Sequence, residues 1–183
     1  MELRNIKFPL KMANGEESKT IEDLRQKNIS SNYTYLNPGD RLTFGNYDGK
    51  EIEWEVIKKT DNTLMIISTH VLCDQKFDIG NYYWSISSLR RWLNDDFYNT
   101  SFSDEEKESI SFENGDNVFL LSKEDAEILM TEEKRAVDSW WWLRTPFPYD
   151  SSYAWLVDSD GGLEHVRSVT RRGGVRPALN LKL

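Results

Sequence analysis

The side chains best suited to metal-ion or nucleophilic chemistry are few in this 183-residue chain, and they lie far apart. There is one cysteine, Cys73, and there are two histidines, His70 and His165. Cys73 lacks the second cysteine of a CxxC motif. His70 and Cys73, three residues apart, supply two possible metal ligands, but no neighbouring residue completes a site. We therefore expect no metal and no cofactor, and we expect Cys73 to be a small buried side chain.

Other patterns with possible chemistry are incomplete. Asp158 and Asp160 resemble a fragment of a calcium loop, but the terminal glutamate of that pattern is missing. They are more typical of a hairpin turn with two solvated acids. The chain has no GxSxG motif, and Gly173-Gly174 is followed by a strand-like segment, whereas a phosphate site needs a helix N-terminus. A Ser/His/Asp set that the fold assembles is not visible in the sequence.

The segment 140–146, WWWLRTP, carries large apolar groups on both faces of a predicted strand. Because strand side chains alternate, Trp140 and Trp142 would face one way and Trp141 and Leu143 the other. Burial of one tryptophan removes roughly 150–250 Å² from water. We therefore predict a central strand that is covered on both sides, with a core role for at least two of the three tryptophans.

Two arginines, Arg144 and Arg176, have apolar neighbours and a proline within the next two residues. A buried guanidinium needs a carboxylate or several carbonyl groups as partners. We interpret both as structural anchors on neighbouring strands, so that the Trp-rich strand and the strand containing Val-Arg-Pro lie side by side. Their partners could include Glu53, Glu55 or Asp158.

The first elements after residue 38 are predicted to be strands. Ile52, Trp54 and Val56 alternate with glutamates, which is the period-two pattern of a half-buried strand. Turn signals at Asp48-Gly49 and Asp61-Asn62 separate this strand from its neighbours. Three strands linked in this way predict a meander, with Trp54 in the core.

Helices follow, and strands then return. Leu89, Trp92, Leu93 and Phe97 recur at helix spacing, after serines that can cap the helix. Trp92 is therefore expected to have a structural role. Further capping sequences begin at residues 103 and 122. The last 44 residues are strand-like, with a hairpin turn at Asp160-Gly161, so the order sheet, helices, sheet predicts an α+β fold.

The chain is expected to contain one main domain and a small N-terminal module. Residues 1–37 indicate a strand, a turn at Asn14-Gly15, a helix that begins near Thr20 and a polar connector. Residues 38–183 are long enough to form a single domain with its own core.

The net charge of −8 is unevenly distributed. Residues 140–183 hold six Lys/Arg and four Asp/Glu and so carry +2, which leaves −10 for residues 1–139. This balance argues against direct binding to nucleic acid or to an anionic membrane. No apolar run approaches the roughly 20 residues of a membrane span, and the first residues lack a signal-peptide pattern. A cytoplasmic location is therefore expected.

Taken together, these motifs resemble a widespread bacterial and phage family of unknown function with a consensus close to W-W-L-R-S-P, a D-G turn and V-R-P-A-L. This sequence has Trp141 to Pro146, Asp160-Gly161 and Val175 to Leu179 at those places. The match covers about residues 38–183. The ending is similar to that of C-type-lectin-like folds, including formylglycine-generating-type enzymes and the variable proteins of diversity-generating retroelements. The resemblance implies a C-type-lectin-like mixed/antiparallel sheet with two to three helices.

In such folds the irregular loops before the last strand display ligand-binding residues. The resemblance places these loops at residues 146–153 and 168–174. The candidate contact residues are Phe147, Tyr149, Tyr153, Arg167, Arg171 and Arg172. Formylglycine-generating chemistry needs a pair of cysteines, and the related iron enzymes need a histidine cluster, so one cysteine and two distant histidines argue against both.

We therefore expect a non-enzymatic recognition domain that binds a protein or a glycan through these two loops. One alternative is an acidic, phage-encoded inhibitor or nucleic-acid mimic, whose −10 body would occupy a basic groove on a partner protein. Another is an uncharacterised hydrolase or transferase.

Overall fold

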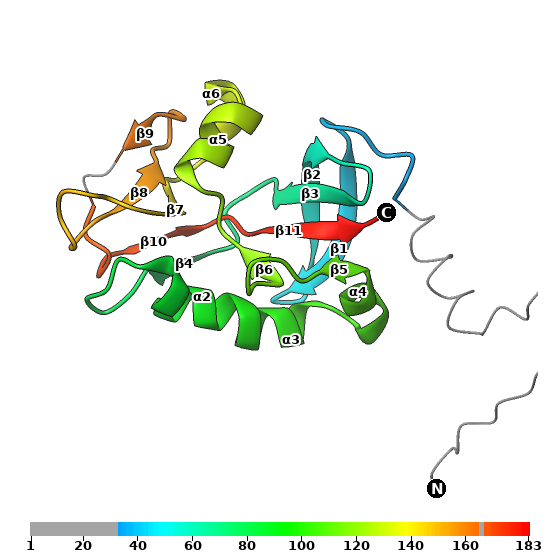
Figure 1. The fold of residues 1–183 in the computed structure, drawn as a ribbon, viewed down its shortest axis with the longest axis horizontal. Coiled ribbons are helices and arrows are strands. Elements are labelled where there is room, and N and C mark those ends of the chain that lie inside the picture. The colour runs from blue at the N-terminus through cyan, green and yellow to red at the C-terminus, as the bar shows by residue number, and fades with distance from the viewer. Residues whose placement is uncertain (1–32, 165–166) are drawn as a thin grey trace, which may run out of the picture.

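Two β-sheets and five short α-helices, two of them joined by a π-helical turn, form the regular structure of the described residues (Figure 1). The structure, a computed structural model, describes residues 33–164 and 167–183. The predicted mixed α+β organisation is confirmed. The N-terminal module predicted over residues 1–37 lies outside the described residues except for 33–37, and so does His165.

The first sheet has the strand order β1-β2-β3-β11-β5, with β6 also paired to β11. Its strands are β1 (Arg41–Tyr47), β2 (Lys50–Lys59), β3 (Thr63–Ser68), β5 (Ile110–Ser111), β6 (Val118–Phe119) and β11 (Ala178–Lys182). The predicted meander is confirmed, because β1, β2 and β3 pair antiparallel in sequence order. At the first turn Asp48 and Gly49 both have positive φ, 51° and 75°, as a tight two-residue hairpin turn requires.

The alternation predicted for β2 breaks at Glu55. Ile52 and Trp54 are buried and Glu53 is exposed, but Glu55 is 8% exposed and Ile57 is buried as well. The β2–β3 register shifts between Val56 and Lys58, because a bulge inserts an extra residue there. Glu55 precedes this bulge, and it pairs with Lys134 of α6 (Glu132–Arg135).

The second sheet has the order β4-β10-β7-β8-β9. Its strands are β4 (Cys73–Lys76), β7 (Trp141–Pro146), β8 (Ala154–Val157), β9 (Leu163–Glu164) and β10 (Arg172–Val175). The β10–β7 pair is parallel and the other pairs are antiparallel. The predicted hairpin around Asp160-Gly161 is confirmed, since it joins β8 to β9.

The segment GVRPALNLKL forms two strands rather than the single strand we expected. Val175 ends β10 beside the Trp-rich strand β7, whereas Ala178 begins β11 in the other sheet. Arg176 and Pro177 form the crossing between the sheets, where the Pro177 carbonyl accepts a hydrogen bond from the Ser68 N–H (2.9 Å). The expectation that the whole C-terminal strand flanks the tryptophans is therefore correct for β10 and wrong for β11.

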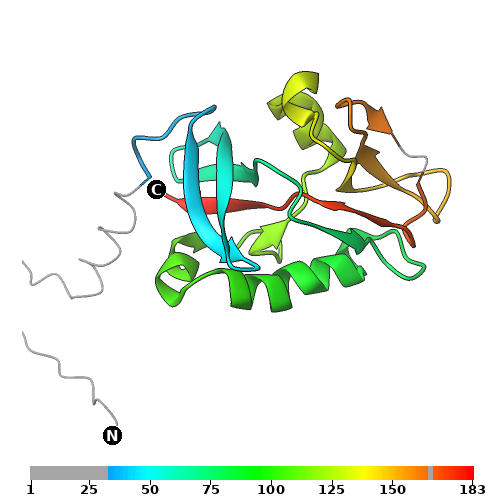
Figure 2. The same ribbon diagram turned by 180° about the vertical axis from the view of Figure 1, so that it is seen from behind.

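One helical segment, residues 88–101, lies along one side of both sheets, with α4 next to its end, and α5 and α6 lie on the other side (Figures 1 and 2). The long segment consists of α2 (Ser88–Trp92), a π-helical turn η2 (Leu93–Phe97) and α3 (Tyr98–Ser101), and the 3-10 turn η1 (Trp84–Ile86) precedes it. Among the predicted capping serines, Ser87 is the N-cap. The other helices are α4 (Asp104–Ser109), α5 (Lys123–Leu129) and α6 (Glu132–Arg135). The capping boxes predicted at Ser103 and Ser122 are both present.

Two hydrophobic clusters fill the space between these layers, and the tryptophans divide between them as predicted. Trp142 packs in the cluster beside the long helical segment, together with Trp54, and Trp140 packs against it. Trp141 and Leu143 belong to the cluster beneath α5. Trp54, Trp141 and Trp142 are fully buried. Both faces of β7 are therefore covered.

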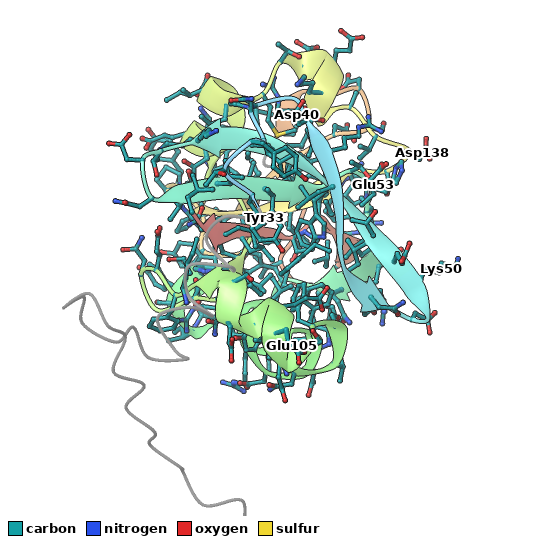
Figure 3. All side chains as sticks on the ribbon, turned by 90° about the vertical axis from the view of Figure 1, so that its right-hand side faces the viewer. Tyr33, Asp40, Lys50, Glu53, Glu105 and Asp138 are labelled. Atoms are coloured by element: carbon teal, nitrogen blue, oxygen red, sulfur yellow. The ribbon has the colours of Figure 1, made fainter. Side chains whose placement is uncertain are left out.

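At the meander end of the molecule, exposed and packed side chains lie close to one another (Figure 3). Lys50 and Glu53 project from β2 into solvent, whereas Tyr33 packs edge-on against Phe44 at 6.2 Å. No helix among the described residues is long and apolar enough to cross a membrane.

Candidate recognition surface

The loop between β7 and β8 is an ordered hairpin loop at the end of the molecule opposite the meander (Figure 1). The Phe147 N–H donates to the Tyr153 carbonyl at 3.1 Å, and the Tyr153 N–H donates to the Asp150 carbonyl at 3.2 Å. The Asp150 carboxylate in turn accepts from the Ser152 N–H at 2.8 Å. These local bonds set the backbone of the loop before any ligand arrives, which reduces the entropy lost on binding.

A cluster of three aromatic rings lies on this loop and on β8. Phe147 contacts both Tyr149 and Trp155 edge to face, with ring centroids 5.5 and 5.9 Å apart. The Lys123 ammonium from α5 lies 5.0 Å from the Trp155 ring centroid. Tyr149 is 87% exposed, whereas Phe147 and Trp155 are half-buried. We call Phe147, Tyr149, Trp155 and Lys123 the aromatic cluster.

The second predicted loop, residues 168–174, lies against the first one. The Val169 N–H donates to the Ser152 carbonyl at 2.9 Å, and Tyr153 and Ser168 form an antiparallel bridge. The structure therefore brings the two predicted loops together, although they come from different parts of the sequence. Tyr153 is half-buried at their contact.

The three arginines predicted as contact residues differ in their surroundings. Arg167 is half-buried, with its guanidinium 4.7 Å from the Trp140 ring centroid and 3.7 Å from the Asp158 carboxylate. Arg172 is exposed and donates to the Asp74 carbonyl at 2.7 Å. Arg171 is exposed. Arg171 and Arg172 are thus accessible to a ligand, whereas much of Arg167 is engaged with the fold.

Gly173 explains why Arg167 and Trp140 can meet beside β10. A Cβ atom at Gly173 would fall inside the Trp140 ring, so no other residue fits there without moving that ring. The tryptophan therefore packs directly on the β10 backbone, half-buried beneath the Arg167 guanidinium. This arrangement joins the second loop to the core.

The arginines predicted as structural anchors have partners that the sequence did not indicate. Arg176 is 2% exposed and donates to the carbonyls of Ser68 (2.7 Å) and Lys134 (3.2 Å). Its guanidinium lies 5.1 Å from the centroid of the Trp141 ring. Burial lowers the pKa of Arg176 to about 10, and the nearby Glu55 carboxylate opposes this shift. Of the three predicted acidic partners, Glu55 is therefore the one near Arg176.

Arg144 pairs with a different acid from those expected. Its guanidinium donates to the Asp125 carboxylate (3.0 Å) and to the Leu120 carbonyl (3.2 Å). The side chain keeps 31% of its surface exposed. Glu53 instead pairs with Arg41 on the exposed meander, and Asp158 pairs with Arg167. Trp92, predicted as structural, is half-buried and packs edge to face with Tyr47 (6.2 Å).

The residues with potential for metal or nucleophilic chemistry do not gather. Within residues 33–164 and 167–183 no three His, Cys, Asp or Glu side chains lie close enough to hold a metal ion. Cys73 is half-buried rather than fully buried, and burial raises the pKa of its thiol. Burial, together with the hydrogen bond to Cys73, raises the pKa of Tyr47 to about 12. Both groups are therefore protonated at neutral pH.

Three residues important to this end of the molecule were missed by reasoning from the sequence. Trp155 and Lys123 complete the aromatic cluster, and the alternation within AWLV was the available signal for Trp155. Arg135 is 9% exposed and donates to the carbonyls of Gly161 (2.8 Å) and Met130 (2.8 Å). It ties the β8–β9 turn to the end of α5. Its sequence, EEKRA, reads as an exposed helix, so no local signal could have indicated its burial.

A family model described as a domain of unknown function (DUF6273) matches residues 61–183. The match begins within the meander and includes the Trp-rich strand, both loops and the C-terminal crossing. No curated protein and no solved structure matches the chain.

Proposed function

The chain belongs to the DUF6273 family, and we propose that it is a non-enzymatic recognition domain that binds a protein or glycan ligand through the loops 146–153 and 168–174. The observation that carries this proposal is the aromatic cluster. Tyr149, which is 87% exposed, forms the tip of this cluster. The Phe147 ring contacts Tyr149 and in turn packs against the Trp155 ring.

The cluster has the composition of a binding hot spot. Aromatic side chains and arginine carry much of the affinity in protein interfaces, because they offer a large contact area at a small entropic cost. Here three rings, the Lys123 ammonium and the exposed Arg171 and Arg172 lie on the two neighbouring loops and the elements beside them. The loops are already ordered by their own hydrogen bonds, which favours binding without large rearrangement.

A C-type-lectin-like arrangement is part of the same proposal. Its support is the mixed sheet in which β10 runs parallel to β7, together with the position of both loops at one end of that sheet. An experimental structure tests this part of the proposal. A C-type-lectin-like fold predicts that the order and connections of its strands match those of known members of that class. A different strand connectivity would refute this part.

The binding proposal is tested by removing the tip of the cluster. We expect Phe147→Ala/Tyr149→Ala to abolish capture of a ligand from a glycan array or from a cell lysate analysed by mass spectrometry. Tyr35→Ala is the matched control, because Tyr35 is also highly exposed (71%) but lies on the connector before β1. Equal capture by wild type, cluster variant and control would contradict the proposal. An array signal identifies a glycan, and a captured protein identifies a protein ligand.

The arginines of the second loop provide an independent test. We expect Arg171→Ala/Arg172→Ala to weaken the same ligand while changing the free energy of unfolding by less than about 0.5 kcal/mol, because both side chains are exposed. A large loss of stability, measured by urea denaturation, would place these arginines in the scaffold instead.

A further inference from the structure

A polar groove lies over one face of the first sheet, and none of the four residues of the aromatic cluster lines it. Its larger part, about 420 Å³, is formed where β7, α5, β6 and η1 approach that sheet, and a smaller part of about 270 Å³ adjoins it. Figure 1 shows this face of β3 and β11 between α5 on one side and β6 on the other. Both parts are lined by Lys58, Met65, Glu113 and Asn180, which therefore mark the waist of the groove.

The floor at the waist is fixed by strand pairing. Met65 on β3 and Asn180 on β11 are direct cross-strand partners, so their side chains lie next to each other on the same face. The Asn180 amide donates to the Glu113 carboxylate at 2.9 Å. This bond holds Glu113, which comes from the turn between β5 and β6, at the rim of the groove.

Trp84 and Phe119 line the larger part, and the polar groups at these rings are already paired. The Arg144 guanidinium lies 5.1 Å from the Phe119 ring centroid while it pairs with Asp125. The Trp84 indole N–H donates to the Asp116 carboxylate at 2.8 Å. An apolar ligand group between Trp84 and Phe119 would therefore leave these polar groups satisfied.

The wall is rigid because the long helical segment holds it. The Asn94 side chain donates to the Val118 carbonyl (2.9 Å), and its amide oxygen accepts from the Asn117 N–H (2.7 Å). Arg90 pairs with Asp116 and donates to the Gly115 carbonyl at 2.6 Å. Asn94 belongs to the π-helical turn, a feature that is frequent at functional sites.

The waist offers one positive and one negative group that are not paired with each other. Asp116 is neutralised by Arg90 and Asp125 by Arg144. Within the described residues neither Lys58 nor Glu113 takes part in an ion pair. Lys58 is exposed and Glu113 is half-buried. The two charges therefore face solvent across the Met65–Asn180 floor.

We propose that this groove binds an extended peptide segment in which an apolar side chain lies near one acidic and one basic residue. The acidic residue would meet Lys58, the basic residue Glu113, and the apolar side chain the space between Trp84 and Phe119. Sites for small molecules enclose most of their ligand, whereas this groove is open and extends over two adjoining hollows, which suits a polymer. Opposite charges at the waist favour a peptide over a neutral glycan and set its direction.

The probe is a phage-displayed library of random peptides of about seven residues. An extended residue spans about 3.3 Å, so such a peptide is long enough to place an apolar, an acidic and a basic side chain along the groove. The library is selected against the full chain, and enriched sequences are made as synthetic peptides for calorimetry. We expect Lys58→Glu and Glu113→Lys each to weaken binding about tenfold. The double variant K58E/E113K should instead prefer peptides in which the acidic and basic residues are exchanged.

Two substitutions of the same chemistry act as controls. Lys50→Glu lies at the other end of β2, and Glu105→Lys lies on α4; both positions are exposed and labelled in Figure 3. They should leave the affinity unchanged. The absence of any enriched peptide, or equal affinity in K58E, E113K and the controls, would overturn the proposal. Peptides that lose binding in Tyr149→Ala but retain it in K58E would also overturn it, since they would use the aromatic cluster.

Discussion

Arg144 and Arg176 have similar sequence contexts, yet they occupy opposite environments. Arg176 is 2% exposed, lies beside the Trp141 ring, and donates to two backbone carbonyls at the crossing between the sheets. Arg144 lies near the end of β7 and lines the open groove, with 31% of its side chain exposed. One arginine joins the scaffold, and the other forms part of a surface.

The difference follows from where each strand leads. After Arg176 the chain passes into the other sheet, so the guanidinium is enclosed by segments of both. Two residues after Arg144 the chain leaves the sheet for the β7–β8 loop, and the guanidinium lies between Asp125 of α5 and the Phe119 ring. A proline after an arginine thus indicates the end of a strand, but not whether that end lies inside the protein.

The largest effect is expected at Arg176. Arg176→Met should lower the free energy of unfolding by about 3 kcal/mol, because it leaves two carbonyls without a donor and removes one of the two cations near the buried Glu55. Urea denaturation measures this directly. A loss below about 1 kcal/mol would mean that Lys134 alone stabilises Glu55, and the crossing would not depend on the arginine.

A smaller and pH-dependent effect is expected at Asp78, in the loop that carries Trp84 toward the groove. Burial alone would raise the pKa of Asp78, but the N–H groups of Ser88, Ile79, Gly80 and Asn81 together lower it. A carboxylate with a lowered pKa stabilises the fold above its unfolded pKa of about 3.9, and this contribution is lost as the pH falls through the folded value.

Asp78→Asn should therefore cost about 1 kcal/mol at neutral pH, because the amide accepts weaker hydrogen bonds than the carboxylate. The gap between wild type and variant should close as the pH falls below about 3.9. Denaturation curves from pH 7 downwards measure it. A gap that stays constant with pH would show that the carboxylate charge does not organise this loop.

The smallest effect on stability is expected at Arg144. Arg144→Met should change the free energy of unfolding by less than about 1 kcal/mol, because its ion pair with Asp125 is partly exposed. It should nevertheless alter which peptides the groove selects, since the guanidinium lines its larger part. A loss as large as that of Arg176→Met would remove the distinction between the two sites.

Local sequence patterns were sufficient to predict most of the helices, strands and turns. The turn at Asp48-Gly49, the alternation from Ile52 to Trp54 and the capping boxes at Ser103 and Ser122 each depend on neighbouring residues alone. For the same reason the division of Trp141 and Trp142 between two faces was predictable. The burial of Glu55 and Arg135 was not predictable, because it depends on partners distant in the sequence: Glu55 pairs with Lys134, and Arg135 donates to the Gly161 carbonyl 26 residues away.

The amino-acid sequence by itself determined the α+β class, the meander, the helix starts and the two-sided burial of the Trp-rich strand, because strand and helix periodicities act over a few residues. Only the tertiary structure decided that the final segment divides between two sheets, that Phe147 and Tyr149 join Trp155 and Lys123, and that Lys58 and Glu113 line the same groove. These outcomes depend on pairings between distant segments. The free energy of such a pairing comes from both partners together, so neither segment alone specifies it.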